Sequence, residues 1–445
     1  MTDRLAAHDE KVRAIAARMR ELAERGERAH IWKGGVHHFV PLPKDPRFAG
    51  RMVDASTLRE VLSIDPEKRL ATAEPGVTFA ELARATLAHG LLPVVVPELE
   101  GITVGGAIAG CSVEAMSYRY GGFHDSCTSY EIVSGGGEVI ECSRESRPLA
   151  FEMIHGSYGT LGVLSRATFA LVPAKRFVRL SYVKHTSFDA FEKDLRARCA
   201  AGEDDFIDAI IHRPDALVLC LGRFVDAAPY TSSYRWLEIF YKSTLARTED
   251  YLTTFDYCFR YDTECHWLTA TFPPLEWKPV RFLVGKWALG STNLIRASGA
   301  LAPVLGLKRR PDVVCDVFIP ARRFGEFWDW YAREFQFFPL WVVPYRVPAI
   351  YPWIAPEHAA RMQDELFIDC AIYGKPNGDP AVDWSERLEE KTYELGGIKT
   401  LISRNHYSAE RFWSIYHREN YDAVKRELDP KGVFPGLYEK LHRVD

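Results

Sequence analysis

The sequence lacks several features that would each assign it to a class of protein. Its nine cysteines are an odd number and include no Cys-x-x-Cys pair, so neither a disulfide framework nor a zinc ribbon is indicated, and we expect no metal site. No apolar run approaches the length that crosses a bilayer, so any membrane contact must be peripheral. No block of like charge forms a tail. A globular chain in the reducing cytosol fits best.

The overall charge is also low. Lysine and arginine number 56 against 60 aspartates and glutamates, a net charge of -4, which argues against nucleic acid as a partner. A length of 445 residues favours two domains over one core. Residues 1–28 are charged throughout, with apolar residues at helical spacing, and therefore predict an amphipathic helix and not a signal peptide.

A dinucleotide fingerprint is missing as well. Three glycines at 135–137 separate the strand-like runs 130–134 and 138–142, which predicts a β-hairpin. A Gly-x-Gly-x-x-Gly fingerprint would have to open a helix instead, and it occurs nowhere else in the chain. A nicotinamide donor would therefore have to dock transiently.

Glycine is concentrated in two places within residues 93–172. The run 97–110 reads Pro-Glu-Leu-Glu-Gly-Ile-Thr-Val-Gly-Gly-Ala-Ile-Ala-Gly, and 155–163 reads His-Gly-Ser-Tyr-Gly-Thr-Leu-Gly-Val. Without Cβ atoms the backbone can run close beside a flat or anionic ligand, although such glycines also mark bulges and turns. Earlier in the chain, the adjacent glycines Gly34 and Gly35 are typical of a loop whose N–H groups converge on a pyrophosphate. Together they indicate a nucleotide cofactor.

The order of these segments carries a resemblance. Two strand-like runs, the turn Glu-Pro-Gly-Val-Thr at 74–78, a helix over 79–90 and the segment Thr-Val-Gly-Gly-Ala-Ile follow one another. This order resembles the FAD-binding domain of the vanillyl-alcohol oxidase and p-cresol methylhydroxylase superfamily, and most closely its Δ24-sterol reductase (seladin, Diminuto/Dwarf1) branch. Further motifs that carry the resemblance along almost the whole chain are 94–106, 120–123, 127–131, 159–162, 259–261, 338–344, 369–376, 412–413 and 434–438.

The resemblance implies an α+β fold: a two-part FAD-binding domain of the p-cresol methylhydroxylase type and an α+β cap domain with an antiparallel sheet. We expect the FAD-binding domain at 1–175, the substrate (cap) domain at 176–400, and a C-terminal segment at 401–445 that returns to the first domain. FAD is expected to be bound without a covalent link, the alternative being a link to His37 or His38. The expected FAD contacts are Gly34, Gly35, Val36, Thr103, Val104, Gly105, Gly106, Ile108, Tyr120, Gly121, Gly159, Thr160, Gly162 and Val163.

The second half of the chain supplies the expected substrate surface. Residues 335–356 hold one charge and five prolines, which forbids a long helix and predicts strands and loops forming an apolar wall suited to a lipid. The apolar stretch 280–307 with a basic end at 308–310 suits a membrane surface, a lipid tunnel or a plain core helix. One helix is predicted over 409–428, and residues 114–125 are predicted to form a loop beside the cofactor.

These features favour a FAD-dependent oxidoreductase that reduces an isolated C=C bond of a lipid. The resemblance implies a Δ24-sterol-like or a methylene-branched fatty acyl substrate, with NADPH as transient donor; the absent membrane-spanning N-terminal segment weighs against the sterol. Because an isolated olefin offers no carbonyl to polarise, an acid must protonate it, and the candidates are Tyr261, His266, Tyr373 and His406. These residues equally suit a polar network between domains.

Two other functions stay open. One is a flavin oxidase or dehydrogenase acting on an alcohol or a sugar-like substrate, and the other is a lipid-binding protein without flavin activity. The expected partners are the lipid substrate, a membrane surface in peripheral contact, and further copies of the chain, with no nucleic acid. The expected location is the cytoplasm, at the inner face of the membrane.

Overall fold

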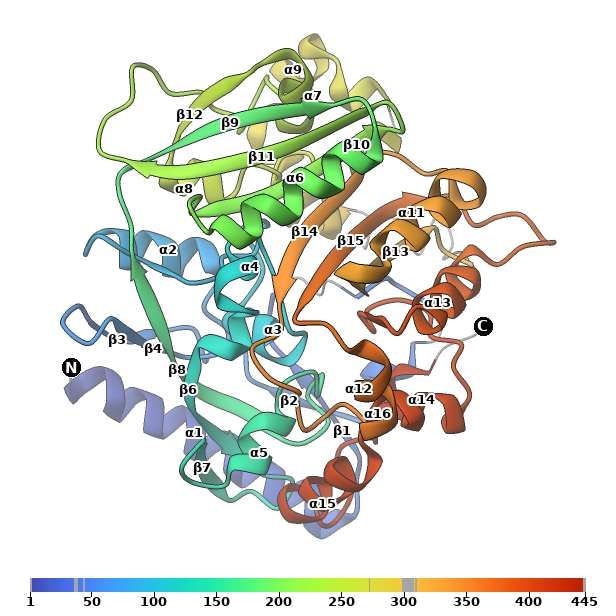
Figure 1. Cartoon of the computed structure of the whole chain (residues 1–445). Helices are drawn as coiled ribbons and strands as arrows, with labels where there is room; N and C mark the ends of the chain where they lie inside the picture. The colour runs from blue at the N-terminus through green and yellow to red at the C-terminus, as the bar shows by residue number, and fades with distance from the viewer. Residues whose placement is uncertain are drawn as a thin grey trace.

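The computed structural model describes residues 2–35, 39–42, 45–271, 273–297, 308 and 310–442. Two large antiparallel sheets dominate the molecule, one built from the first 173 residues and one from the strands that follow (Figure 1). A parallel pair of short strands accompanies the first sheet. This α+β architecture, with a two-part first domain, is the expected fold class.

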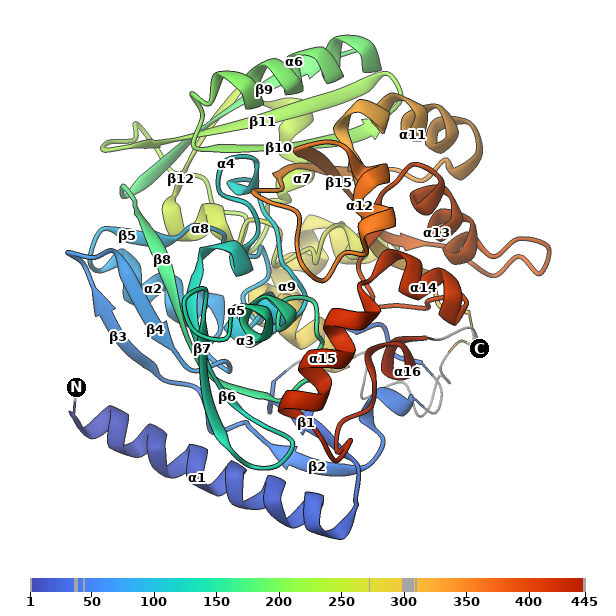
Figure 2. The ribbon, with the colours of Figure 1, turned by 60° about the horizontal axis from the view of Figure 1, so that its bottom comes forward.

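The small part of the first domain joins one long helix to the parallel strand pair. Helix α1 (Thr2–Arg25) occupies the predicted amphipathic segment, followed by β1 (Ala29–Trp32) and β2 (Arg51–Asp54). Val12, Met19 and Leu22 of α1 are buried against this pair, and the helix runs along one edge of the domain (Figure 2). The helical spacing of these residues explains why that face is the buried one.

The larger part is a six-stranded sheet in the order β3-β4-β8-β6-β7, with β5 on β8. The predicted hairpin is confirmed, since β6 and β7 pair antiparallel around the three glycines. Helix α2 begins at a capping box in which Thr78 and Glu81 satisfy each other's backbone N–H groups. The elements are β3 (Val61–Asp65), β4 (Leu70–Ala73), α2 (Phe79–Leu87), β5 (Leu91–Pro93), α3 (Val104–Ala109), α4 (Ser117–Tyr120), β6 (Cys127–Val133), β7 (Val139–Ser143), α5 (Pro148–Met153) and β8 (Val163–Pro173).

The second sheet has eight strands in the order β12-β9-β11-β10-β14-β15-β13-β16. Helices α6, α11 and α13 cover its outer face, and its inner face turns toward the first domain (Figure 1). Its elements are β9 (Phe177–His185), α6 (Phe188–Ala201), β10 (Phe206–Arg213), β11 (Ala216–Val225), α7 (Phe240–Ala246), β12 (Glu249–Thr253), α8 (Thr254–Cys258), α9 (Lys278–Leu289), β13 (Val313–Pro320), α11 (Phe324–Trp330), β14 (Leu340–Arg346), α12 (Pro356–Met362), β15 (Leu366–Lys375), α13 (Trp384–Glu394) and β16 (Ile398–Lys399).

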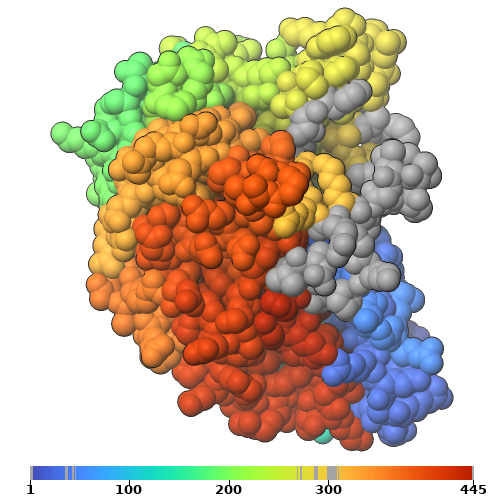
Figure 3. Space-filling model, turned by 90° about the vertical axis from the view of Figure 1, so that its right-hand side faces the viewer, coloured from blue at the N-terminus to red at the C-terminus, as the bar shows by residue number. Residues whose placement is uncertain are grey.

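The C-terminal helices come back to the first domain. They are α14 (Ala409–Ile415), α15 (Arg418–Leu428) and α16 (Leu437–Leu441). The amide of Ala29 donates to Val433 at 2.8 Å and that of Gly135 to Leu428 at 2.7 Å, which ties the two ends of the chain together. Figure 3 shows this segment, in red, directly beside the orange part of the cap on one face of the molecule.

Two expectations about local structure were wrong. The single helix predicted over 409–428 is two helices, because His417 leaves the helical conformation and its side chain accepts from the amide of Asn420 to start the second one. The loop predicted at 114–125 contains helix α4. The stretch predicted at 280–307 includes part of α9, and residues 298–307 lie outside the described chain. Within the described residues, no helix has both the length and the apolarity needed to cross a membrane.

Candidate functional site

A half-buried lysine without an acidic partner marks one end of the site. Lys33 follows β1, and within the described chain no carboxylate lies at ion-pairing distance from its ammonium. Burial lowers the pKa of Lys33 to about 8. A Cβ built on Gly106 would lie 3.9 Å from Lys33 Nζ, so this cation faces the start of α3. An ammonium held in this way is suited to an anion.

The glycines of three separate segments meet beside this lysine. Gly34 has φ +70° and a Cβ there would lie 2.4 Å from Ser56 Cβ, so only glycine fits the turn. Gly105 packs its backbone against Pro75, and Gly159, with φ +71°, lies beside Ile31 of β1. The loops at 33–35, 103–106 and 157–160 therefore surround one space. Two lysines pin the last of these loops: Lys425 donates to Thr160 O and Lys440 to Tyr158 O, each at 2.7 Å.

Three of the four proposed proton donors, Tyr261, His266 and Tyr373, form an aromatic stack on the inner face of the cap. The His266 ring lies 4.5 Å from that of Tyr261 and 4.8 Å from that of Tyr373, centroid to centroid. Trp341 of β14 closes the stack at 4.5 Å from His266. His266 Nε2 also lies 2.8 Å from a carboxylate oxygen of Glu98, which belongs to the first domain. The stack therefore sits at the boundary between the two sheets.

The backbone that presents His266 is strained. Cys265, His266 and Trp267 have φ values of +46°, +51° and +52°, three consecutive non-glycine residues in the left-handed region. This conformation costs about 1–2 kcal/mol per residue. All three side chains are buried, so packing holds the turn in place and fixes the imidazole against its aromatic neighbours.

A buried ion pair supports the stack from behind. The Arg260 guanidinium lies 2.9 Å from Asp208 and 3.4 Å from Glu114. Both Tyr261 OH and Trp341 Nε1 donate to the same Asp208 oxygen, at 3.2 and 2.9 Å. Burial raises the pKa of Glu114 to about 8, against the opposing effect of Arg260. The hydroxyl of Tyr261 is therefore engaged inside the cap.

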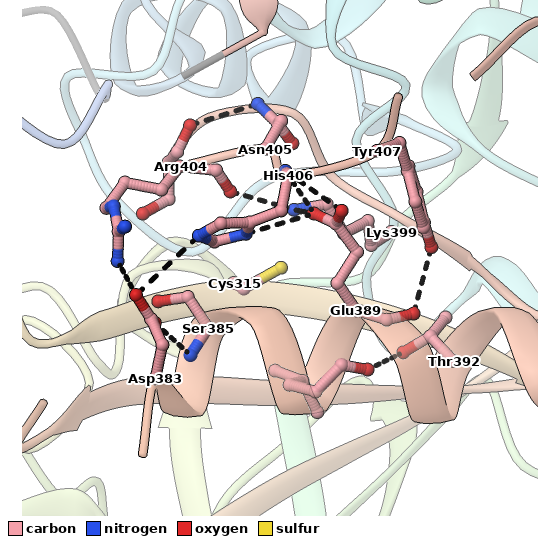
Figure 4. A network of polar contacts seen from close by, with 12 residues as sticks. Cys315, Asp383, Ser385, Glu389, Thr392, Lys399, Arg404, Asn405, His406 and Tyr407 are labelled. Carbon is pink, nitrogen blue, oxygen red and sulfur yellow. Dashed lines mark hydrogen bonds and ion pairs between the residues drawn. The ribbon is translucent and has the colours of Figure 1, made fainter. Parts of the chain in front are cut away.

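His406 does not join this group. It lies in a polar network between α13 and the loop before α14, shown in Figure 4. Its amide donates to Glu389 at 2.9 Å, and its ring nitrogens lie 3.8 Å from Asp383 and 3.7 Å from Glu389. Lys399 holds the same glutamate at 2.7 Å. The structure thus brings Tyr261, His266 and Tyr373 together and places His406 apart from them.

An apolar cavity lies beside the segment Lys399–Leu401, and the residues of the aromatic stack are not among those that line it. Its walls come from the first domain, the cap and the C-terminal helices together. Aromatic and aliphatic side chains form most of its lining, among them Phe318, Tyr345, Trp353, Ile354, Trp413 and Leu437. Thr400 is one of its few polar wall residues, and it bonds to Asp316 of β13.

Comparison with known proteins bears directly on the first domain. Residues 6–143 match a family model described as an FAD binding domain. The chain contains an FAD-binding domain. This match covers most of α1, the parallel strand pair, the loop that carries Lys33, helix α3 with Gly106, and most of the six-stranded sheet.

Relatives of the FAD-binding domain extend the similarity along the chain. Delta(24)-sterol reductase of Homo sapiens is 24% identical over 449 residues, covering 98% of this chain and 86% of the human protein. The Arabidopsis thaliana protein of the same name is 25% identical over 437 residues, covering 87% and 76%. Cytokinin dehydrogenase 2 of rice is 29% identical over 167 residues, 35% of this chain and 30% of its own. The resemblance seen in the sequence is confirmed, and the chain is a FAD-dependent oxidoreductase.

The residues of the FAD-binding domain fit the cofactor. The unpaired ammonium of Lys33 and the space that a Cβ on Gly106 would fill suit a pyrophosphate. Thr103, Val104 and Ile108 hold this corner, since Thr103 caps α3 by accepting from the amide of Gly106. Among the described residues, no atom lies within 4 Å of a Cβ built on Gly35, which leaves room there for a ligand. When bound, FAD supplies two-electron redox chemistry.

Other expected FAD contacts are placed differently. Gly162 and Val163 pack against the paired strand β6, so their backbone serves the sheet. Tyr120 and Gly121 end α4, which packs on β14 of the cap. Val36, His37 and His38 lie outside the described residues. The FAD-contact role of this whole set stays a prediction.

The sequence analysis missed Lys33, Glu98, Asp208, Asp316 and Asp369. A usable signal was present for the aspartates, since each is the lone charge inside an apolar strand: Phe-Ile-Asp-Ala-Ile, Val-Cys-Asp-Val-Phe and Phe-Ile-Asp-Cys-Ala. A charge at such a position must be paired or neutral when the strand is buried. Lys33 carries no comparable sequence signal, because its lack of a partner appears only in three dimensions.

Proposed function

We propose that this protein reduces an isolated C=C bond of a lipid, using bound FAD that is reduced by NADPH. The observation that carries the proposal is the apolar cavity, whose wall residue Thr400 is connected to the cap stack through Asp316 and Tyr373. Pockets that bind small molecules are mostly apolar, with a few polar groups that fix orientation. This cavity suits a hydrocarbon chain or ring system with its reactive bond near Thr400.

The chemistry of the lining favours a lipid over an alcohol or a sugar. A sugar-binding site needs several hydrogen-bonding side chains directed at hydroxyl groups, because buried polar groups without partners are costly. Here Lys399, the charged lining residue, already binds Glu389 and the carbonyl of Arg404. The relatives named Delta(24)-sterol reductase support the same choice.

The roles proposed for the cap residues follow from their positions. The stack of Tyr261, His266 and Tyr373 is a rigid support behind the cavity. Tyr373 holds the carboxyl group of Asp316, which bonds to the cavity residue Thr400. His406 belongs to the separate network that fixes the loop entering the C-terminal segment.

We also propose that lipid reaches the protein from a membrane surface. Four large apolar side chains lie exposed near α9: Trp236, Trp277, Phe282 and Leu283, the last 83% exposed. Trp236 stacks on Phe282 with ring centroids 5.5 Å apart, so they form one patch. Tryptophan beside aliphatic residues is typical of surfaces that insert shallowly into a bilayer. This patch supports peripheral contact, as expected for a protein at the inner face of a membrane.

Anaerobic stopped-flow spectroscopy of the flavin-loaded protein tests the proposed function. NADPH should bleach the flavin absorbance, and one class of olefin, a Δ24-sterol or a methylene-branched acyl lipid, should restore it. Whichever class restores the colour is the substrate class. If NADPH leaves the flavin oxidised while an alcohol or sugar bleaches it and air restores it rapidly, the protein is an oxidase and the proposal is wrong.

A further inference from the structure

We propose that Asp316 is the acid that protonates the olefin in this site. The inference rests on the proposed function and deepens it by assigning a proton donor. Asp316 is a partly exposed carboxylic acid whose hydrogen-bond partner Thr400 lines the cavity, whereas Tyr261, His266 and Tyr373 carry no carboxyl group.

The register of the cap sheet directs Asp316 toward the first domain. Asp316 pairs with Ala371 of β15, which pairs in turn with Trp341 of β14, so these residues form one row across three strands. Trp341 belongs to the inner-face stack, whereas the neighbours of Asp316 in sequence, Cys315 and Val317, are buried in the outer-face core. Because successive side chains alternate between faces, Asp316 shares the face of Trp341. It remains partly exposed there.

Two hydroxyl groups hold the carboxyl group in one orientation. Tyr373 OH donates to Asp316 Oδ1 at 2.7 Å, and Thr400 Oγ1 lies 3.3 Å from Oδ2. Thr400 accepts from the amide of Asp316 at 3.1 Å, which fixes its own position. Since Thr400 lines the cavity, Asp316 Oδ2 lies one side chain from the space proposed for the substrate.

The alternative donors are weaker acids or are enclosed. Tyr261 is fully buried, and its hydroxyl donates a hydrogen bond to Asp208. His266 is 2% exposed, with Nε2 against Glu98. Tyr373 points its hydroxyl at Asp316. Burial, and to a lesser extent the charge of Asp316, raises the pKa of this phenol far above its ordinary value.

Burial raises the pKa of Asp316, and the neighbouring charges act in both directions. Glu98 raises it further, whereas the Tyr373 hydrogen bond, His266 and Thr400 lower it. Behind it, Asp369 is 2% exposed with one carboxyl oxygen unpartnered, and burial raises its pKa well above the ordinary value. The titratable groups that face Asp316 are Glu98, Tyr158, His266, Asp369 and Tyr373.

Saturating a C=C bond adds a hydride, which carries two electrons, to one carbon and a proton to the other. FAD bound in the first domain and reduced by NADPH would supply the hydride, so that the flavin would be oxidised as the olefin is reduced. Asp316 gives its proton to the second carbon as a new C–H bond forms, and it is left as a carboxylate. A proton from solvent restores the acid before the next turnover.

Asp316→Asn is the direct test, because it keeps the shape and removes the acid. With NADPH and the olefin that reoxidises the wild-type flavin, we expect unchanged FAD content and unchanged bleaching by NADPH, but reoxidation by olefin at least about 100-fold slower. Asp312→Asn is the matched control, an exposed aspartate directly before β13 that pairs with Lys308. It should reoxidise like the wild type. Normal olefin reoxidation in Asp316→Asn would overturn the assignment.

The pH profile gives a second test that does not depend on that variant folding. The wild-type olefin step should fall as pH rises and Asp316 loses its proton. Tyr373→Phe removes a hydrogen bond that lowers the pKa of Asp316, so this descending limb should move to higher pH. If the wild-type rate does not change with pH, or if the descending limb of the pH profile does not move in Tyr373→Phe, the assignment of Asp316 is wrong while the proposed function still stands. If no olefin reoxidises even the wild-type flavin, both the proposed function and this assignment fall.

Discussion

Replacing Lys33 by methionine should weaken FAD binding strongly while leaving the fold intact. Burial lowers the pKa of this ammonium from 10.5 to about 8, so holding it charged inside the apo protein is unfavourable. A bound pyrophosphate supplies the missing partner and should return the pKa toward its ordinary value. Methionine keeps the length and apolar stem of the side chain and removes only the charge.

The size of the effect follows from that pKa change. A return from about 8 to 10.5 corresponds to about 3 kcal/mol, or an affinity change of about 300-fold. Above pH 8 Lys33 is mostly neutral in the free protein, so it must take up a proton when FAD binds. Wild-type affinity for FAD should therefore be greatest below pH 8 and fall by up to about tenfold for each pH unit above it. Lys33→Met should show the weaker affinity already at pH 7 and lack the decline.

Titration of the apo protein with FAD, followed by flavin fluorescence between pH 7 and 9, measures this directly. Lys33→Arg should retain most of the affinity, since the charge remains. Lys68→Met is the matched control, because Lys68 lies in the same domain with a side chain 75% exposed. If Lys33→Met binds FAD like the wild type, or keeps the same decline above pH 8, then Lys33 does not face the pyrophosphate and the placement of the cofactor is wrong.

Other predictions test the glycine loop, the N-terminal helix and the exposed patch. Gly34→Ala should lower the melting temperature, because φ is +70° and Ser56 occupies the space of the new Cβ. Gly35→Ala should keep the melting temperature of the wild type and weaken FAD binding. Equal melting temperatures for the two variants would contradict the loop geometry. Burial alone lowers the pKa of His8, but hydrogen bonds with Glu131 and Glu74 outweigh it and raise this pKa to about 9. This raised pKa contributes about 3 kcal/mol, in full below pH 6.5 and lost as pH rises through 9. His8→Gln should therefore unfold more easily in urea at pH 6 but match the wild type near pH 10. Leu283→Ser with Phe282→Ser should reduce flotation with liposomes more than tenfold, whereas Ile350→Ser, exposed elsewhere, should leave flotation unchanged.

Local sequence rules predicted the elements that depend on local interactions. Helix α1 follows from the spacing of Val12, Met19 and Leu22, and helix α2 from the capping box at Thr78 and Glu81. The hairpin of β6 and β7 follows from its three glycines. In each case the residues that decide the structure lie within a few positions of one another.

The arrangement of the site depends on contacts between distant residues, and these were harder to predict. Glu98 meets His266 from another domain, and Asp316 meets Thr400 across 84 positions of sequence. His406 carries the same side chain as His266 but lies among carboxylates, whereas His266 is stacked between aromatic rings. Residue type alone therefore could not separate the two histidines. A lone aspartate in an apolar strand was the one sequence signal for the acids of the cap.

The lysines that pin the 157–160 loop set an order of events during protein synthesis. Lys425 and Lys440 bind carbonyls of Thr160 and Tyr158, more than 260 residues earlier in the chain. On the ribosome, the first sheet is complete long before either lysine has been added. The hydrogen bonds that hold this loop can therefore form only after those late residues have been added, so the loop is among the last parts of the first domain to be fixed.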